Sequence, residues 1–239
     1  MGEVLSKVAA AAVPGVTTEE LDDLAERLIR DFGDEPSFLG YQPEGAMRPF
    51  PATLCVSIND EVVHGIPSPV RTLKSGDIIS LDLGLTHNGL ILDSAITVPV
   101  GKVSPEALKL INASDVALAA GIAAARPGNR IGDISQAIGE AYKGTGFTIV
   151  KILGGHGVGE YVHEEPFIAN YGKGGDGPKI VAGMVLALEP IATNGKAGVV
   201  IAPDGYTYRT KDGSLASHSE HTILIEDAGT IVLTHGAGE

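Results

Sequence analysis

The residues best suited to chemistry in this chain are four acids in or beside strand-like apolar runs. Asp82 and Glu189 each lie inside such a run, where burying an unpaired carboxylate is costly. Asp93 lies in another run of strand character, and Glu220 comes just before a further one. Like charges buried close together repel each other, and divalent cations offset that repulsion. Four carboxylates carry about four negative charges, so they predict an oxygen-rich site for two divalent ions.

His156 is the histidine best placed to join these acids. It lies in the run Gly154–Gly159, whose small residues leave the imidazole room to reach a ligand. The glycines lack the G-x-G-x-x-G spacing of a nucleotide-binding loop, and no helical pattern follows them. We therefore interpret His156 as a metal ligand. His218 and His221 flank Glu220, and strand alternation predicts that His221 faces away from it.

His64 and His163 occupy matching places in two similar runs, Val63–Pro67 and Val162–Pro166. Either histidine alone would be interpreted as a satisfied core residue. Because the two runs belong to an internal repeat, we expect both side chains at the junction of the repeated halves, in contact with substrate.

The elements that must position these residues occur twice along the chain. A helix with the capping-box pair Thr17 and Glu20 follows one Pro-Gly turn, and a second amphipathic helix follows the Pro-Gly turn at 127–128. The run Gly76–Asp82 resembles Gly183–Glu189, because an acid ends both after the same number of residues. The pattern in each half predicts two helices followed by strands. The sequence therefore predicts an α+β fold with pseudo-two-fold symmetry.

Nothing resembling a linker separates the two halves. We expect one catalytic domain over residues 1–239, with halves of about 1–100 and 101–239. Ser104-Pro105 predicts the start of a long helix in the second half, because Pro is favoured at the first helical position. The apolar run Phe147–Leu153 predicts a strand before His156.

The turn at 87–89 joins the two strand-like runs that carry Asp82 and Asp93. A turn centred after His87 would pair the two acids directly. A tight loop made by the next two residues would instead pair Asp93 with Gly84. Side chains alternate along a strand, so both registers place the two carboxylates on one face.

Composition excludes several other classes of function. The net charge is -13 with 17 basic residues and no basic run, which argues against a nucleic-acid partner. No apolar stretch is expected to reach the length of about 20 residues that spans a bilayer, so we expect no membrane contact. The single cysteine, Cys55, excludes a disulfide framework and suits a reducing cytoplasm.

The ordered motifs of the chain resemble those of the methionine aminopeptidase family, among the pita-bread metallopeptidases of family M24. They span nearly the whole chain and are very specific as a set, and the compact spacing of Glu189 and Glu220 is similar to the type I subclass. That family's first helix begins earlier than Met1 allows, so we expect a shortened helix that affects stability more than chemistry. The motifs are Asn59–Pro67, the Asp82/Asp93 hairpin, Gly155–Gly159, His163–Pro166, Leu188–Pro190 and Ser219–Thr222.

The resemblance implies a pita-bread fold, with two helix-helix-strand halves around a curved antiparallel sheet, and a dinuclear centre of Co, Mn, Fe(II), Zn or Ni. Asp82 would bind one ion, His156 and Glu189 the other, and Asp93 and Glu220 would bridge the two. A hydroxide held by the metals would attack the first peptide carbonyl.

Three residues are implied to act in catalysis. Glu189 would shuttle a proton as well as bind metal, His163 would stabilise the tetrahedral intermediate, and His64 would contact the substrate backbone or the leaving nitrogen. The family pocket for the Met side chain maps onto Phe38, Tyr41, Phe50, Cys55, Val162 and Tyr206.

Three departures from the family pattern concern this pocket. The segment Gln42–Pro49 is longer than usual, Val162 stands where a larger aromatic is common, and Tyr206 stands where a Trp is common. We therefore expect a slightly wider pocket and a less strict preference for Met.

The resemblance implies removal of N-terminal Met from nascent polypeptides by a cytoplasmic monomer, with the ribosome as a further candidate partner. An Xaa-Pro aminopeptidase or prolidase is the nearest alternative, since those enzymes share the five ligands but generally carry an added N-terminal domain. A non-catalytic pita-bread binding protein is a second alternative. Such relatives lose metal ligands, whereas this chain keeps all five.

Overall fold

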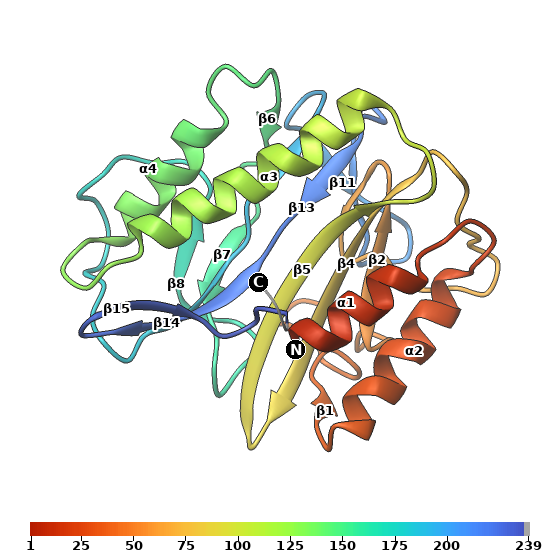
Figure 1. The fold of residues 1–239 in the computed structure, drawn as a ribbon, viewed down its shortest axis with the longest axis horizontal. Helices are drawn as coiled ribbons and strands as arrows, with labels where there is room; N and C mark the ends of the chain where they lie inside the picture. The colour runs from red at the N-terminus through yellow and green to blue at the C-terminus, as the bar shows by residue number, and fades with distance from the viewer. Residues whose placement is uncertain (237–239) are drawn as a thin grey trace.

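Four helices lie on one side of a set of antiparallel strands in the described part of the chain, residues 1–236 (Figure 1). The structure is a computed structural model. The helices are α1 (Gly2–Ala11), α2 (Thr18–Asp31), α3 (Pro105–Ala124) and α4 (Ile131–Ala141). The strands are β1 (Glu35–Pro36), β2 (Leu54–Ile58), β3 (Glu61–Val63), β4 (Ile78–His87), β5 (Leu90–Pro99), β6 (Thr148–Ile149), β7 (Gly154–Gly157), β8 (Glu164–Ala169), β9 (Val185–Leu188), β10 (Ile191–Thr193), β11 (Val199–Ile201), β12 (Tyr208–Thr210), β13 (Ala216–His218), β14 (His221–Glu226) and β15 (Gly229–Val232).

All strand pairings in the four sheets of this region are antiparallel. In the first sheet β4 pairs with β1, β2 and β5, and in the largest the order is β15-β14-β9-β7-β8. The other two sheets are three-stranded, with the orders β13-β10-β6 and β11-β12-β3. Helices and antiparallel sheet are mixed along the chain, so the predicted α+β class is confirmed.

The predicted helix starts are confirmed at both helix pairs. Thr17 caps α2 by accepting a hydrogen bond from the Glu20 backbone N–H, and the Glu20 carboxylate accepts one from the Thr17 N–H. Ser104 caps α3 in the same way through Ala107, with Pro105 as the first helical residue.

Two buried clusters form the main cores. One joins α1 and α2 to β2, β4 and β5, and includes Val8, Leu21 and Leu81. The other joins α3 and α4 to the strands of the second half, and includes Leu110 and Ile138. Each helix pair therefore packs mainly against its own sheet, which supports our proposal that the chain is one domain made of two related halves.

Helix α3 corrects one expectation from composition. It has 20 residues and a mean hydropathy of 1.4 over an 18-residue window, so by length and composition it reaches the range of a membrane-crossing helix. Its alanine-rich sequence produces this value. Leu110, Ala117 and Leu118 on its inner face are buried in the core of the second half, against the strands that α3 crosses (Figure 1).

The strand predicted over Phe147–Leu153 is mostly wrong. Only Thr148 and Ile149 are in β6, where they pair with β10. The chain then turns, leaving Ile152 65% exposed, before it enters β7 in a different sheet. The apolar pattern was present, but the change of sheet leaves no partner strand for the rest of the run.

Candidate metal centre

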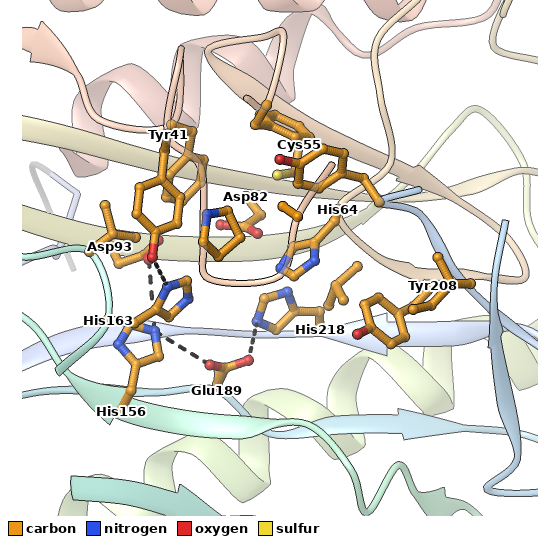
Figure 2. Close-up of a pocket in the computed structure, with 18 of the residues that line it drawn as sticks. Tyr41, Cys55, His64, Asp82, Asp93, His156, His163, Glu189, Tyr208 and His218 are labelled. Atoms are coloured by element: carbon orange, nitrogen blue, oxygen red, sulfur yellow. Dashed lines mark hydrogen bonds and ion pairs between the residues drawn. The ribbon is translucent and has the colours of Figure 1, made fainter. Parts of the chain in front are cut away.

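The β4–β5 hairpin places the first two acids on one face. A two-residue loop of Asn88 and Gly89, both with positive φ (51° and 82°), closes the hairpin. Gly84 is therefore paired with Asp93, as the tight-loop alternative predicts, and Asp82 is paired with Ala95. The two acids are diagonal neighbours across the strands, with both side chains directed into the same space (Figure 2).

The second pair of acids joins the hairpin through backbone hydrogen bonds. Leu188 of β9 is paired with His221 of β14, so Glu189 and Glu220 face each other one step beyond the ladder. Glu220 exchanges two backbone bonds with Ala95: its N–H donates at 2.7 Å, and its carbonyl accepts at 3.3 Å. This connection between the halves fixes Glu220 beside the hairpin acids.

Glycines bring His156 to the same place. His156 lies in β7 opposite Ala187 of β9. A Cβ on Gly155 would lie 2.3 Å from the Ala187 carbonyl oxygen, and a Cβ on Gly157 would lie 2.4 Å from the backbone carbonyl oxygen of Glu165. Only glycine therefore permits this packing. The His156 Nε2 atom is 3.6 Å from Glu189 Oε1 and 4.0 Å from Asp93 Oδ2.

Ligand atoms of Asp93, His156 and Glu220 lie within 4.8 Å of one another, and all three residues are buried. The 4.0 Å between His156 Nε2 and Asp93 Oδ2 is too long for a direct hydrogen bond, and the grouping fits donors gathered around a cation. Oδ1 of Asp93 and Oδ1 of Asp82 are buried with no hydrogen-bond partner in the described residues. Unsatisfied buried oxygens of this kind are costly unless a ligand takes them, so the donor set fits divalent ions.

Burial dominates the electrostatics of the cluster. It raises the pKa of Asp82 to about 7. It also raises the pKa of Asp93, Glu189 and Glu220 well above the usual range, and the neighbouring carboxylates add to each increase. Burial lowers the pKa of His156 to about 4, so its imidazole is neutral and can donate a lone pair at neutral pH.

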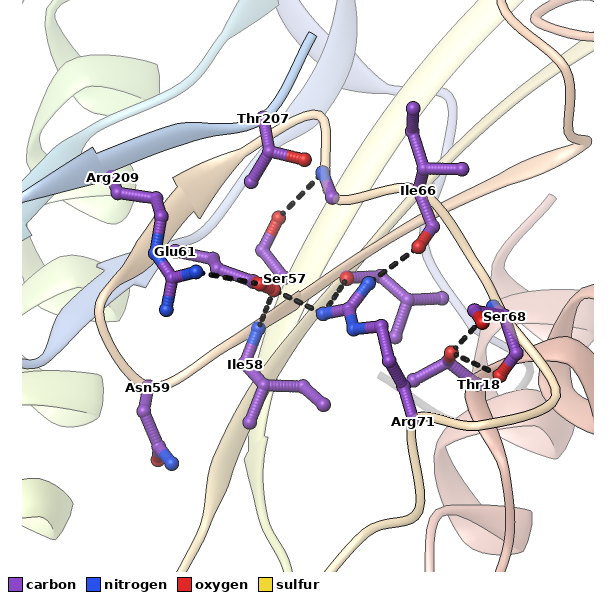
Figure 3. Close-up of polar contacts among 12 residues, drawn as sticks. Thr18, Ser57, Ile58, Asn59, Glu61, Ile66, Ser68, Arg71, Thr207 and Arg209 are labelled. Atoms are coloured by element: carbon purple, nitrogen blue, oxygen red, sulfur yellow. Dashed lines mark hydrogen bonds and ion pairs between the residues drawn. The ribbon is translucent and has the colours of Figure 1, made fainter. Parts of the chain in front are cut away.

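The loop that carries His64 is fixed by polar contacts (Figure 3). His64 has a positive φ of 58°, and its carbonyl accepts a bond from the Thr207 hydroxyl at 3.3 Å. The Gly65 N–H donates to Ser57 Oγ at 3.1 Å, and a Cβ on Gly65 would meet the Val56 carbonyl oxygen at 2.1 Å. The backbone around His64 therefore has little freedom to move.

Arg71 completes this loop by contacting both its ends. Its guanidinium forms an ion pair with Glu61 and donates to the carbonyls of Ile66 and Val56 (Figure 3). The side chains of Arg71 and Glu61 are 24% and 11% exposed, so the pair is largely desolvated.

We expect Arg71→Met to lower the free energy of unfolding by about 3 kcal/mol, because the largely buried Glu61 carboxylate keeps only the Ile58 N–H and a long 4.0 Å contact with Arg209, and two carbonyls lose their donor. Equilibrium urea unfolding of the metal-free protein measures the change. Arg209→Met is the matched control. Its ion pair with Asp60 is more exposed, at 45% and 24%, and its contact with Glu61 is long, at 4.0 Å, so losing both is expected to cost less than about 1 kcal/mol. Equal losses in the two variants would contradict the role given to Arg71.

His163 lies at the mouth of the site. Its Nδ1 is 2.9 Å from the Tyr41 hydroxyl, and its ring lies 4.6 Å from the ring of His156. His64 packs edge-on against Tyr208, with ring centroids 5.8 Å apart. The two histidines therefore approach the acids from opposite sides (Figure 2).

One cavity of about 430 Å³ contains every site residue expected from the sequence. The four acids and His156 form its floor. His64 and His163 flank them, and the six expected pocket residues complete the wall. Phe50 and Tyr206 meet edge-on with centroids 5.2 Å apart, and the Tyr206 hydroxyl bonds to the Arg48 carbonyl. Glu44, in the segment of unusual length, also lines the cavity.

Among the further residues that line the cavity, sequence reasoning missed His218 and Tyr208. His218 is 2% exposed, and its Nε2 lies 3.6 Å from Glu220 Oε2 and 3.7 Å from Glu189 Oε2. The available signal was strand alternation, because His218 and Glu220 are two residues apart and should share a face. His221 contacts Thr234 and does not line the cavity, as predicted.

Comparison with known proteins places this site in a family. The model of metallopeptidase family M24 matches residues 1–227. A methionine aminopeptidase of Aquifex aeolicus is 46% identical over 236 residues, which cover 98% of this chain and 92% of that one. The crystal structure of a methionine aminopeptidase from Thermotoga maritima superposes with a TM-score of 0.93 at 38% identity, covering 98% of this chain and 91% of that one.

The chain belongs to metallopeptidase family M24. Membership and the buried Asp–His–Glu cluster together indicate that it binds divalent metal. The prolidase of Pyrococcus furiosus shares the fold, with a TM-score of 0.71 at 22% identity, but this chain covers only 63% of that protein.

Proposed function

We propose that this chain is a metal-dependent methionyl aminopeptidase, a hydrolase that removes the N-terminal Met from nascent polypeptides. The observation that carries the proposal is the cluster of three buried carboxylates, the largely buried carboxylate of Glu189 and a histidine, at the floor of a cavity with an aromatic side pocket. The similarity to methionine aminopeptidases along nearly the full chain supports the choice of substrate.

We further propose that the centre holds two ions, drawn from Co, Mn, Fe(II), Zn and Ni. Asp82 would hold one ion, His156 and Glu189 would hold the other, and Asp93 and Glu220 would be shared by both. Two divalent ions balance about four negative charges, and the unpartnered Asp82 and Asp93 oxygens support the assignment. When bound, such ions supply an activated water and polarise the substrate carbonyl.

The protein's own residues orient the substrate and move protons. Glu189 has one oxygen directed toward His156 and the other toward His218, which suits a carboxylate that both binds metal and carries a proton. The Tyr41 hydroxyl fixes the His163 ring at the mouth, where His163 would stabilise the oxyanion. His64 faces the same space and would contact the peptide backbone (Figure 2).

The side pocket suits an unbranched apolar side chain. Phe38, Phe50, Cys55 and Val162 are buried there, and Tyr206 closes it. A thioether packs favourably against aromatic rings, which supports Met as the residue removed. Val162 leaves more room than a large aromatic would, so we expect measurable turnover of other linear apolar residues.

A comparison of two peptides tests this function. Met-Ala-Ser should be hydrolysed by the metal-loaded protein, with release of free Met, much faster than Ala-Pro-Ala. Faster turnover of the proline peptide would make the chain an Xaa-Pro aminopeptidase. Metal-free protein that takes up neither Mn nor Co at about micromolar concentration would favour a non-catalytic binding protein.

We also propose that the enzyme acts as a monomer in the cytoplasm, on polypeptides that emerge from the ribosome. The single cysteine, Cys55, is buried and free, which suits a reducing compartment. The net charge of -13 gives no support to direct contact with nucleic acid.

A further inference from the structure

His218 is a buried histidine in the metal centre to which the proposed ligand set gives no role. It ends β13, and its backbone is held on both sides by Thr97: the His218 N–H donates to Thr97 Oγ1 at 2.9 Å, and that hydroxyl donates to the His218 carbonyl at 2.7 Å. The Ser80 hydroxyl, 2.8 Å from Thr97 Oγ1, completes the arrangement. The imidazole therefore projects from a fixed point.

The imidazole is directed between two carboxylates. Its Nε2 is 3.6 Å from Glu220 Oε2 and 3.7 Å from Glu189 Oε2, and the side chain is 3% exposed. Neither ring nitrogen has a hydrogen-bond partner in the described residues. Both neighbours are acceptors, so they favour the tautomer that carries its proton on Nε2. A shift of roughly half an ångström would bring either oxygen within hydrogen-bond distance.

Glu189 is the residue on which this arrangement acts. Its Oε1 lies 3.6 Å from Nε2 of His156, whereas its Oε2 lies 3.7 Å from Nε2 of His218 (Figure 2). The two histidines therefore face different oxygens of one carboxylate. A donor on the Oε2 side restricts rotation of the carboxylate and keeps Oε1 directed toward the cluster.

We propose that His218 is a positioning residue that donates its Nε2–H to Glu189 and Glu220 and thereby sets the orientation in which these carboxylates meet the metal. For the proton-carrying role of Glu189, this inference rests on the proposed function. For metal binding it rests only on the geometry of the cluster.

Three substitutions separate donation from other roles. His218→Gln keeps an N–H donor at about the reach of Nε2, but has no imidazole. His218→Asn has the same amide on a shorter side chain that cannot reach the carboxylates. His218→Leu keeps apolar volume without a donor. His87→Gln, the same change in a histidine with 61% side-chain exposure at the hairpin turn, is the matched control.

Calorimetric titration of metal-free protein with Mn and with Co measures the effect without substrate. We expect His218→Leu and His218→Asn to bind metal about 10- to 100-fold more weakly than the unmodified protein, and His218→Gln to stay close to it. Steady-state kinetics on Met-Ala-Ser should show the same order, with the loss in kcat rather than in KM. His87→Gln should change neither property.

Equal losses in the Gln and Leu variants would overturn the inference, because the imidazole itself would then be needed, as for a direct ligand. Unchanged metal affinity in the Asn and Leu variants would overturn it as well. If Leu prevents folding, the Gln and Asn pair gives the same contrast. If the unmodified protein fails to cleave Met-Ala-Ser while the order of metal affinities holds, the proposed function fails and the positioning role stands.

Discussion

Asp93→Ala is expected to lower kcat/KM for Met-Ala-Ser by more than about a thousandfold, which corresponds to about 4 kcal/mol of transition-state stabilisation. Asp93 is one of three residues whose ligand atoms lie within 4.8 Å of one another, and its Oδ1 is buried with no other partner. Removing it takes one of four negative charges from the site. In the proposed two-ion centre, the donors that remain would not hold both ions in place.

The fold should survive this substitution because Asp93 serves β5 through its main chain. Its N–H donates to Thr222 Oγ1 at 2.9 Å, and its carbonyl accepts from the same hydroxyl at 2.7 Å. Alanine at this position keeps both main-chain hydrogen bonds. The change also relieves repulsion among carboxylates, so the metal-free variant should be at least as stable as the unmodified protein.

The measurement is kcat/KM after chelator treatment and metal add-back, together with the calorimetric metal stoichiometry. Asp31→Ala, on the exposed end of α2, is the matched control and should retain full activity. Retained turnover in Asp93→Ala under these conditions would show that the shared-ligand assignment is wrong.

The sequence was sufficient to predict the face on which the acids lie, but not their register. Alternation along a strand places Asp82 and Asp93 on one face whichever turn is used. The register depended on whether Asn88 would adopt a positive φ, which Asn tolerates but does not require. In the folded chain it does so at 51°, and Gly89 follows at 82°.

The pocket residues could be placed only through resemblance. Phe38 and Tyr206 are far apart in the chain, and no periodicity relates them, although they lie in one buried cluster. His218 was missed for a different reason. The sequence shows that it lies two residues before Glu220 and should share its face of a strand. Its proximity to Glu189, however, depends on how β13, β9 and β14 are arranged in space.

The metal-free protein is expected to lose stability as the pH rises above 6.5. Burial raises the pKa of Asp82 to about 7, and the pKa values of Asp93, Glu189 and Glu220 are raised well above their usual range. Near neutral pH the folded chain therefore binds more protons at these carboxyls than the unfolded chain does. A state that binds more protons loses stability as protons become scarce.

The histidines of the site change the stability of the metal-free protein with pH in the opposite direction, but they do so at lower pH. Burial lowers the pKa of His64 and His156 to about 4 and that of His218 to about 3, against a usual value of 6.5. The unfolded chain protonates them below pH 6.5 while the folded chain does not, which removes stability as the pH falls. Between about pH 4 and 6.5 the two effects oppose each other. Above that range, of the acids and histidines in the site, only the carboxyls contribute.

From about pH 6.5 to about pH 8.5, each carboxyl that is still protonated in the folded chain lowers the free energy of unfolding as the pH rises, and Asp82, with a pKa of about 7, stops contributing as it ionises within this interval. Equilibrium urea unfolding with chelator present, across this interval, measures the slope. Saturating Mn should flatten it, because bound ions take the place of the protons. Asp93→Ala should reduce the slope in the metal-free protein, since it removes one of the raised groups. Metal-free stability that rises with pH above 6.5 would contradict the view that burial raises the pKa of these carboxyls in the folded protein.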